Sequence, residues 1–250
     1  MSNPSNSGQV LSGLEDTQIT MNSSPQPPIN FIPETWEVIE KVGEDTVTHF
    51  CVAPSMRKGP SRSCVSISRY PGLEQNCERL QSELPRLSGL SSPPELQALK
   101  HFKQQGCNVV PEILGYQFEK QDMEDIIPGG FVTYVIWKKV PGEPLDFTRF
   151  WNCTFSERDI IRDKFRQIYE VFLRFDYQVW VPSSTKIIYD WSTGEMHISG
   201  FKDATNRFLG KVWSDDQYAE HGLVLDAPSI RSYFPIESTD LYRDDNGWEW

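Results

Sequence analysis

The side chains that could do chemistry in this chain are scattered, and they do not form a known catalytic or metal-binding motif. The histidines are His49, His101, His197 and His221. None has a carboxylate or a cysteine at the spacing of a triad or of a zinc site. The five cysteines are odd in number and include no Cys-x-x-Cys pair, so neither zinc nor a disulfide framework is indicated. Three carboxylates, Asp176, Asp190 and Asp203, cluster in sequence, but their spacing defines no acid–base pair.

Composition and charge exclude several classes of function. The chain has 250 residues and a net charge of −11. Because an acidic surface repels phosphate groups, we expect neither nucleic acid nor a membrane surface as a partner. No apolar run approaches the roughly 18 residues that span a bilayer. The first residues lack the basic and apolar regions of a signal peptide. With the unpaired cysteines, these features predict a cytoplasmic protein.

Hydrophobic patterning predicts a tail and two lobes. Residues 1–30 are rich in Ser, Asn, Pro and Gln, so we expect a disordered tail. Residues 31–140 are predicted to form a small antiparallel-sheet lobe, since short runs of β-branched and aromatic residues alternate with turn residues. Its expected strands are 35–43, 48–55, 62–70, 109–120 and 129–140, and its expected helices are a short one within 78–90 and a longer one at 91–106.

Residues 141–250 are predicted to form a shortened, mainly helical lobe. The spacing of apolar residues predicts a long helix over 156–179, with Ser156 as its cap and Asp159 completing a variant of the capping box. Its buried face is expected to hold Ile160 or Ile161, Phe165, Ile168, Phe172 and Phe175. A β-hairpin is predicted at 185–199, with its turn at Ser192, Thr193 and Gly194, and a helical stretch at 205–222.

This order of elements, and four stretches of sequence, resemble the kinase-like fold of the aminoglycoside phosphotransferase type, as found in its fungal members. The stretches are ELQALKHFKQQGCNVVPEILGY, IPGGFVTYVIWKKVPGEPL, SERDIIRDKFRQIYEVF and KIIYDWSTGEMHISGFKDA. The last stretch is the most specific, because at this place members of the family have the sequence Asn-Ile-Leu-Tyr-Asp, then a turn, and then Asp-Phe-x-Asp-Ala. The resemblance implies an α+β, kinase-like fold of two lobes.

The resemblance also implies that the residues of phosphoryl transfer are missing. The base Asp of the family corresponds to Val181, and the histidine before it to Val179. The metal-binding Asn corresponds to Lys186 and the metal-binding Asp to Gly200, while Asp203 matches an Asp outside the metal shell. Valine accepts no proton, and lysine repels a divalent cation. Since phosphoryl transfer depends on metal and positioning, no metal site is expected.

The small lobe offers only weak nucleotide contacts under the same resemblance. The phosphate-binding lysine of the third strand corresponds to Ser68 or Arg69, and its partner, a helix carboxylate, to Glu95. Arginine does not replace lysine readily at a tight phosphate site. The glycine-rich loop shrinks to VGEDT, in which two acids would repel phosphate. Arg69, Glu95, Lys186 and Asp203 are therefore the candidate nucleotide-binding residues. Arg69 is better explained as a surface strand residue, Glu95 as a helix N-terminal acid and Lys186 as a solvated turn lysine.

Three functions remain open from the sequence. The first is a catalytically degenerate, kinase-like protein that acts as a binding or accessory module in a fungal secondary-metabolite pathway. Such a pseudokinase would need no cofactor, and its partner would be a protein or a small molecule in the cleft between the lobes. The second is a divergent small-molecule phosphotransferase, or another enzyme on this fold, which would use ATP and magnesium. The third is a partial paralogue with a truncated second lobe and no selected chemistry.

Overall fold

The computed structural model of the chain describes two compact units. The first comprises Met1–Lys100 and Glu112–Lys139, and the second His101–Pro111 and Val140–Trp250. The residues described are 18–21, 34–44, 47–54, 63–70, 93–123, 129–179, 182–202, 204–206, 210, 212–225 and 240–250. They form antiparallel sheets and helices, so the predicted α+β class is confirmed.

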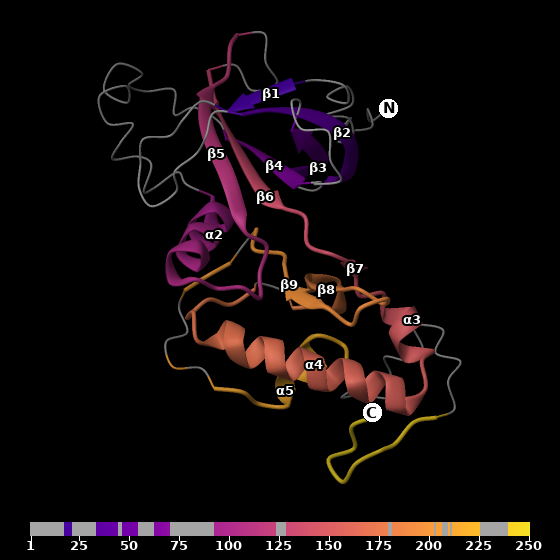
Figure 1. Ribbon diagram of the computed structural model, residues 1–250. Helices are drawn as coiled ribbons and strands as arrows, with labels where there is room; N and C mark the ends of the chain where they lie inside the picture. Colours follow the sequence, from indigo (N-terminus) through magenta and orange to yellow (C-terminus); the bar gives the residue numbers. More distant parts are fainter. Residues whose placement is uncertain are drawn as a thin grey trace, which may run out of the picture. The chain divides into compact units, whose positions relative to one another are not determined.

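A six-stranded antiparallel sheet dominates the first unit (Figure 1). Its strands follow the spatial order β1-β2-β3-β4-β6-β5. They are β1 (Gln18–Met21), β2 (Glu34–Glu44), β3 (Val47–Pro54), β4 (Ser63–Tyr70), β5 (Ile113–Lys120) and β6 (Phe131–Lys138). The last five agree with the strands that the sequence predicts. The β-branched and aromatic residues of β6 suit its place between two neighbouring strands.

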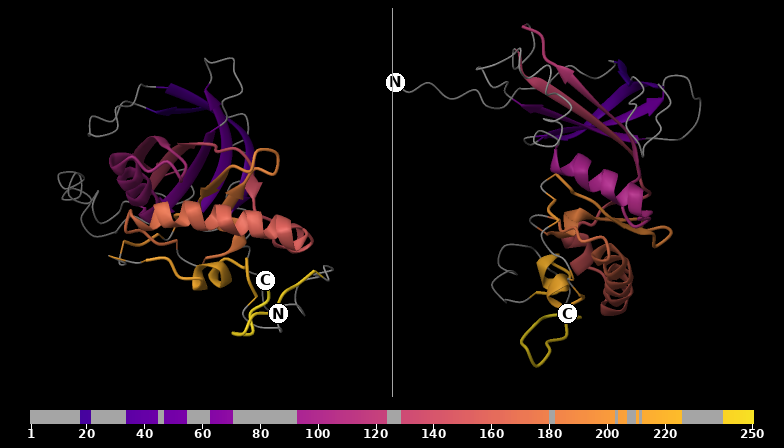
Figure 2. Two further views of the ribbon diagram at one scale, coloured as in Figure 1. Left: turned by 60° about the horizontal axis from the view of Figure 1, so that its bottom comes forward. Right: turned by 90° about the vertical axis from the view of Figure 1, so that its left-hand side faces the viewer.

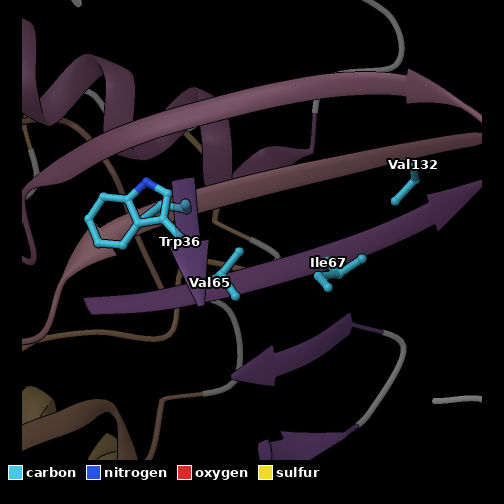
Figure 3. Packing of buried hydrophobic residues seen from close by; sticks show 5 residues of the cluster. Trp36, Val65, Ile67 and Val132 are labelled. Atoms are coloured by element: carbon cyan, nitrogen blue, oxygen red, sulfur yellow. The ribbon is translucent and has the colours of Figure 1, made fainter. Parts of the chain in front are cut away.

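One face of this sheet forms a hydrophobic core. Trp36 of β2, Val65 and Ile67 of β4, and Val132 and Ile136 of β6 are buried together (Figure 3). Residues at alternate positions of a strand point to the same face, which is why Val65 and Ile67 share this core.

Strand β1 lies within the segment predicted as a disordered tail, and there the prediction differs from the structure. Gln18 pairs with Glu37 and Met21 with Glu34, in antiparallel register. Ile19 packs against the core cluster, while Gln18 and Thr20 are exposed. A single apolar residue between polar neighbours is a weak signal in sequence, but it suffices to dock a short strand at a sheet edge. The helix predicted within 78–90 falls outside the described residues.

Helix α2 (Pro94–Gln105) agrees with the predicted helix. Leu96, Leu99 and Phe102 are buried along one side of it, as their spacing indicates. Gly106 follows the last turn with φ +70°, a left-handed conformation that ends the helix.

The described residues of the second unit that follow α2 form a three-stranded sheet, two short α-helices, one long α-helix and one 3₁₀ turn. The strands and the helices are seen in Figures 1 and 2. Its elements are β7 (Glu143–Pro144), α3 (Phe147–Trp151), α4 (Phe155–Leu173), η1 (Ser184–Lys186), β8 (Ile187–Tyr189), β9 (Met196–Ile198) and α5 (Asp216–Glu220). Strands β8 and β9 form the predicted hairpin, and β9 packs against α4. Within the predicted helical stretch 205–222, the described residues form a helix only at α5.

The long helix α4 begins earlier than the sequence predicts. Thr154 is its N-cap, and a capping box joins the Thr154 hydroxyl to the Glu157 amide and the Glu157 carboxylate to the Thr154 amide. Ser156, the predicted cap, lies in the first turn. The pair Thr154 and Glu157 satisfies two helix N-terminal donors at once, which the shorter Asp159 side chain cannot do three residues after a serine.

Only one of the two isoleucines predicted as alternatives lies on the buried face of α4. Ile161 is buried, whereas Ile160 is 63% exposed. Phe165 and Phe172 are buried as predicted. Phe172 lies 5.7 Å from Phe102, measured between ring centroids. The C-terminal parts of α2 and α4 therefore share one aromatic core.

Candidate functional site

The hairpin of β8 and β9 positions the residues on which the functional prediction depends. Ile187 and Ile198 face each other across the hairpin, and both are fully buried. The Ile198 amide donates to the Val109 carbonyl at 2.8 Å, which ties β9 to the segment after α2. The Ser199 amide donates to the Lys186 carbonyl at 2.8 Å. The backbone of Lys186 and of the residues after Ile198 is thus fixed by a buried sheet.

Lys186 and Gly200, the two positions that the sequence resemblance predicts to correspond to metal ligands, lie directly against each other. Gly200 has φ +80°, so its backbone suits a glycine. A Cβ atom built on Gly200 would lie 2.2 Å from Cδ of Lys186 and 3.0 Å from both its Cε and its Nζ. The lysine side chain therefore occupies the space where a side chain at position 200 would begin.

Asp190 is held within the turn of the hairpin. Among the residues described, no group of three or more His, Cys, Asp or Glu side chains could hold a metal ion. The Asp190 carboxylate accepts hydrogen bonds from the Ser192 amide at 2.8 Å and from its hydroxyl at 2.7 Å. These bonds hold the pKa of Asp190 below its usual value. Asp190 therefore stabilises the hairpin turn.

Asp176 has a conformational role of its own. Its φ of 56° is left-handed, which aspartate tolerates better than most residues. It follows the end of α4, where the Asp176 amide donates to the Leu173 carbonyl at 3.4 Å. Asp203, the third acid of the sequence cluster, and Val181 lie outside the described residues.

The small-lobe candidates Arg69 and Glu95 lie on separate elements of the first unit. Arg69 is in β4 and pairs with Val132 of β6, and the structure does not describe its side chain. Glu95 is in the first turn of α2 and is 6% exposed. A position in the first turn favours an acid, because the helix dipole is positive there. Their pairing stays a prediction.

Gly142 brings β7 close to the hairpin, a feature that the sequence analysis missed. Its φ is +97°, and a Cβ at this position would lie 2.5 Å from the backbone carbon and oxygen of Tyr189 and 2.6 Å from the Asp190 amide nitrogen. Only a residue without a side chain allows this approach. In sequence, the Pro141-Gly142 pair indicates a turn, but not the strand against which the turn packs.

Comparison with known proteins adds little information about function to this geometry. No family model and no curated protein matches the chain. Among solved structures, the chain is similar to the kinase PK-1 of the Cydia pomonella granulovirus, with a TM-score of 0.44 and 10% identity. The similarity covers 68% of this chain and 52% of that chain, so this chain spans about half the length of the viral protein. In the parts of the chain described, no helix has the length and apolar character needed to cross a bilayer.

Two arginines of α4 form the other unusual feature of the second unit. Arg158 and Arg162 are 0% and 1% exposed. The Nη2 of Arg158 donates to the Asp240 carbonyl, and to the Trp250 carbonyl at 3.3 Å. The Nε of Arg162 donates to the Leu223 carbonyl at 2.9 Å, and burial lowers its pKa to about 10. These arginines tie later segments of the chain to α4.

Aromatic rings surround the Arg162 guanidinium. Its carbon lies 5.4–5.8 Å from the ring centroids of Phe150, Trp151, Phe155 and Trp250. Both terminal nitrogens of Arg162 lack a hydrogen-bond partner, and Nη1 lies 3.9 Å from Oδ1 of the exposed Asp159, so the rings and this carboxylate together compensate its charge. The sequence analysis missed this cluster, since a charged residue on the face of a helix is normally expected in solvent.

The buried His221 acts in packing. His221 is fully buried, and its Nδ1 lies 2.8 Å from the Gln217 carbonyl. Its ring packs against Phe165 and Tyr169 at centroid distances of 4.9 Å and 5.2 Å. His197 lies on β9, where burial lowers its pKa. Neither ring belongs to a group of metal-ligating side chains among the described residues.

Proposed function

We propose that the chain is a kinase-like protein that has lost phosphotransferase activity and acts as a binding or accessory module. The order of its elements supports a kinase-like fold. After β1, five strands with one helix (β2 to β6 with α2) are followed by β7 and the short helix α3, then by the long helix α4 and the β8–β9 hairpin. This is the order in which the four resembling stretches occur.

The contact between Lys186 and Gly200 is the observation that carries the proposal. In the resembling enzymes, an Asn and an Asp at these positions hold a magnesium ion. Here the lysine stem fills the space above the glycine, with Cδ 2.2 Å from the position of a Cβ. A side chain at position 200 therefore cannot be restored while Lys186 keeps its place.

Electrostatics disfavour a metal ion beside Lys186. A divalent cation about 4 Å from an ammonium group would be repelled by roughly 8 kcal/mol at an effective dielectric constant of about 20. Oxygen ligands normally offset such costs for magnesium. Of the two described acids within the hairpin, Asp190 already accepts two hydrogen bonds from Ser192, and Glu195 is exposed.

Phosphoryl transfer from ATP tests the proposal directly. The purified chain is incubated with ATP and magnesium, and release or transfer of the terminal phosphate is measured. We expect no turnover above the buffer rate, and none in Val181→Asp, because Lys186 and Gly200 still exclude the metal. Turnover by the unmodified chain that is lost on chelation of magnesium would refute the proposal and support the divergent phosphotransferase.

The resemblance to fungal members suggests a wider setting. We propose that the module serves a secondary-metabolite pathway and works in the cytoplasm with a protein or small-molecule partner. Cys107 and Cys153 are free thiols, which suits a reducing compartment. Pull-down from a fungal extract expressing such a pathway would test the setting. Failure to recover any enzyme of the pathway would count against it.

A further inference from the structure

We propose that Cys51 and Cys64 are a redox-sensitive pair that closes to a disulfide between strands β3 and β4. The oxidant would be a small disulfide of the glutathione type. In sequence the two cysteines are separated by residues 52–63, so only the pairing of the strands brings them together. The inference goes beyond the proposed function and does not depend on it, because it concerns a covalent change within the first unit.

The register of β3 and β4 places the two cysteines directly opposite each other. Cys51 pairs with Cys64, and the antiparallel pairing is unbroken from Val47 to Val52 along β3. In such a pair, opposite residues share one face of the sheet, and their Cα atoms lie about 4.5–5.5 Å apart. A disulfide requires a Cα separation of about 4.4–6.8 Å. The register therefore supplies the backbone separation that a disulfide needs.

Alternation along β4 places Cys64 on the face of the sheet that is opposite to the core cluster. Val65 belongs to that cluster, and neighbouring residues of a strand point to opposite faces. Cys64 and Ser66 therefore share the other face, and the residues paired with them are Cys51 and His49 of β3. An apolar core raises the pKa of a thiol and makes it inert. Polar neighbours on this face favour the reactive thiolate by comparison.

The other described cysteines are free thiols of low reactivity. Cys107 follows α2 and Cys153 follows α3, and both are free. Burial raises the pKa of Cys107 to about 11 and also raises the pKa of Cys153. Because the thiolate is the species that attacks a disulfide, both should react slowly. Cys77 lies outside the described residues, so the experiment must identify the bonded cysteines directly.

The oxidation consists of two thiol–disulfide exchanges. One protein thiolate attacks a sulfur of oxidised glutathione, which forms a mixed disulfide and releases one glutathione thiolate. The second protein thiolate attacks the protein sulfur of that mixed disulfide and releases the other glutathione. The protein loses two protons and two electrons, and oxidised glutathione gains them. In a reducing compartment the pair stays as thiols, and a rise in oxidised glutathione closes it.

The bond would fasten β3 to the middle of the six-stranded sheet. Strand β4 lies between β3 and β6, and β3 carries β2 and β1 on its other side. A cross-link between residues 51 and 64 closes a loop, which removes conformational entropy from the unfolded chain. The oxidised chain should therefore resist urea better than the reduced chain.

Peptide mapping of the unmodified full chain tests the inference. Trypsin cleaves after lysine and arginine, so the two cysteines fall in separate peptides, residues 42–57 and residues 63–69. The chain is equilibrated with mixtures of reduced and oxidised glutathione, alkylated, digested and examined by mass spectrometry. We expect the two peptides to be joined, and to separate after treatment with dithiothreitol. The equilibrium constant for closure should be at least tenfold larger in the folded chain than in concentrated urea, because only the folded chain has the register.

Serine variants link the bond to stability. Oxidation of the unmodified chain should raise its urea midpoint. Cys51→Ser should abolish both the joined peptides and this rise, and Cys64→Ser is a second variant if the first fails to fold. Cys77→Ser and Cys153→Ser are the matched controls, and both should keep the joined peptides and the rise.

Each contrary result has a definite meaning. The inference is overturned if no joined peptides form at glutathione ratios that oxidise the thiols of the unfolded chain. Equal equilibrium constants in the folded chain and in urea would show that the register does not bring the cysteines together. A bond from Cys51 or Cys64 to Cys77 in place of the predicted one would refute the pair, and an unchanged urea midpoint would refute its effect on the sheet. None of these results bears on the proposed function, which phosphoryl transfer tests separately.

Discussion

The substitution Gly200→Ala should destabilise the chain by about 2 kcal/mol. A left-handed conformation at φ +80° costs a residue with a side chain about 1–2 kcal/mol. Replacing glycine stiffens the unfolded chain and returns about 0.4–1 kcal/mol. The new methyl group would lie 2.2 Å from Cδ of Lys186, so the lysine must leave its rotamer. That movement adds about 0.5–1.5 kcal/mol.

A double-mutant cycle isolates the contribution of the lysine. The free energy of unfolding is measured in urea for Gly200→Ala, Lys186→Ala and the double variant. We expect a coupling energy of about 1 kcal/mol, because removal of the lysine relieves the clash but not the backbone strain. Gly106→Ala is the matched control, since Gly106 has φ +70° and no atom within 4 Å of an added Cβ. Equal costs for both glycines, with zero coupling, would refute the contact on which the account depends.

Other predictions concern the elements around the hairpin. Gly142→Ala should cost several kcal/mol more than Gly194→Ala in urea denaturation, because its Cβ would lie 2.5 Å from the Tyr189 backbone whereas that of Gly194 lies 3.9 Å from the Tyr189 hydroxyl. Equal losses would contradict this approach of the two segments. Arg162→Met should leave the free energy of unfolding unchanged or raise it by about 1–4 kcal/mol, because a buried, poorly hydrogen-bonded charge is replaced by an apolar chain. A loss above about 2 kcal/mol would show that the aromatic rings compensate the charge fully. Burial raises the pKa of Tyr218 from 10.0 to about 12, so its contribution to stability is present below pH 10 and is lost as the pH rises toward 12. Tyr218→Phe should reduce the fall in stability between pH 9 and pH 11, and an unchanged fall would refute this origin.

Most elements of the fold could be predicted because their signals are local. The strands β2 to β6 and helix α2 agree with periodicity and turn residues, and the hairpin agrees with its Ser192 to Gly194 turn. The predicted start of α4 was wrong by a few residues, because Thr154 with Glu157 and Ser156 with Asp159 both have the pattern of a capping box. Strand β1 escaped prediction because its apolar residue Ile19 packs against a cluster formed by strands distant in sequence.

For the candidate site, the sequence predicted which two residues replace metal ligands, but not how those residues are arranged. The sequence indicates that Lys186 and Gly200 stand where the resembling family has metal ligands, but not that their atoms touch. That contact depends on the hairpin register, in which Ile187 faces Ile198, and on the left-handed φ of Gly200. The burial of Arg158 and Arg162 also depends on tertiary contacts, with carbonyls of residues 61 to 92 positions away.

The central claim is that the hairpin no longer holds a divalent cation. Titration of manganese into the chain, with free ion followed by electron paramagnetic resonance at 0.15 M salt, measures this directly. We predict no stoichiometric site in the unmodified chain, and the appearance of one in the double variant Lys186→Asn with Gly200→Asp. A stoichiometric manganese site in the unmodified chain that Gly200→Ala abolishes would contradict the account.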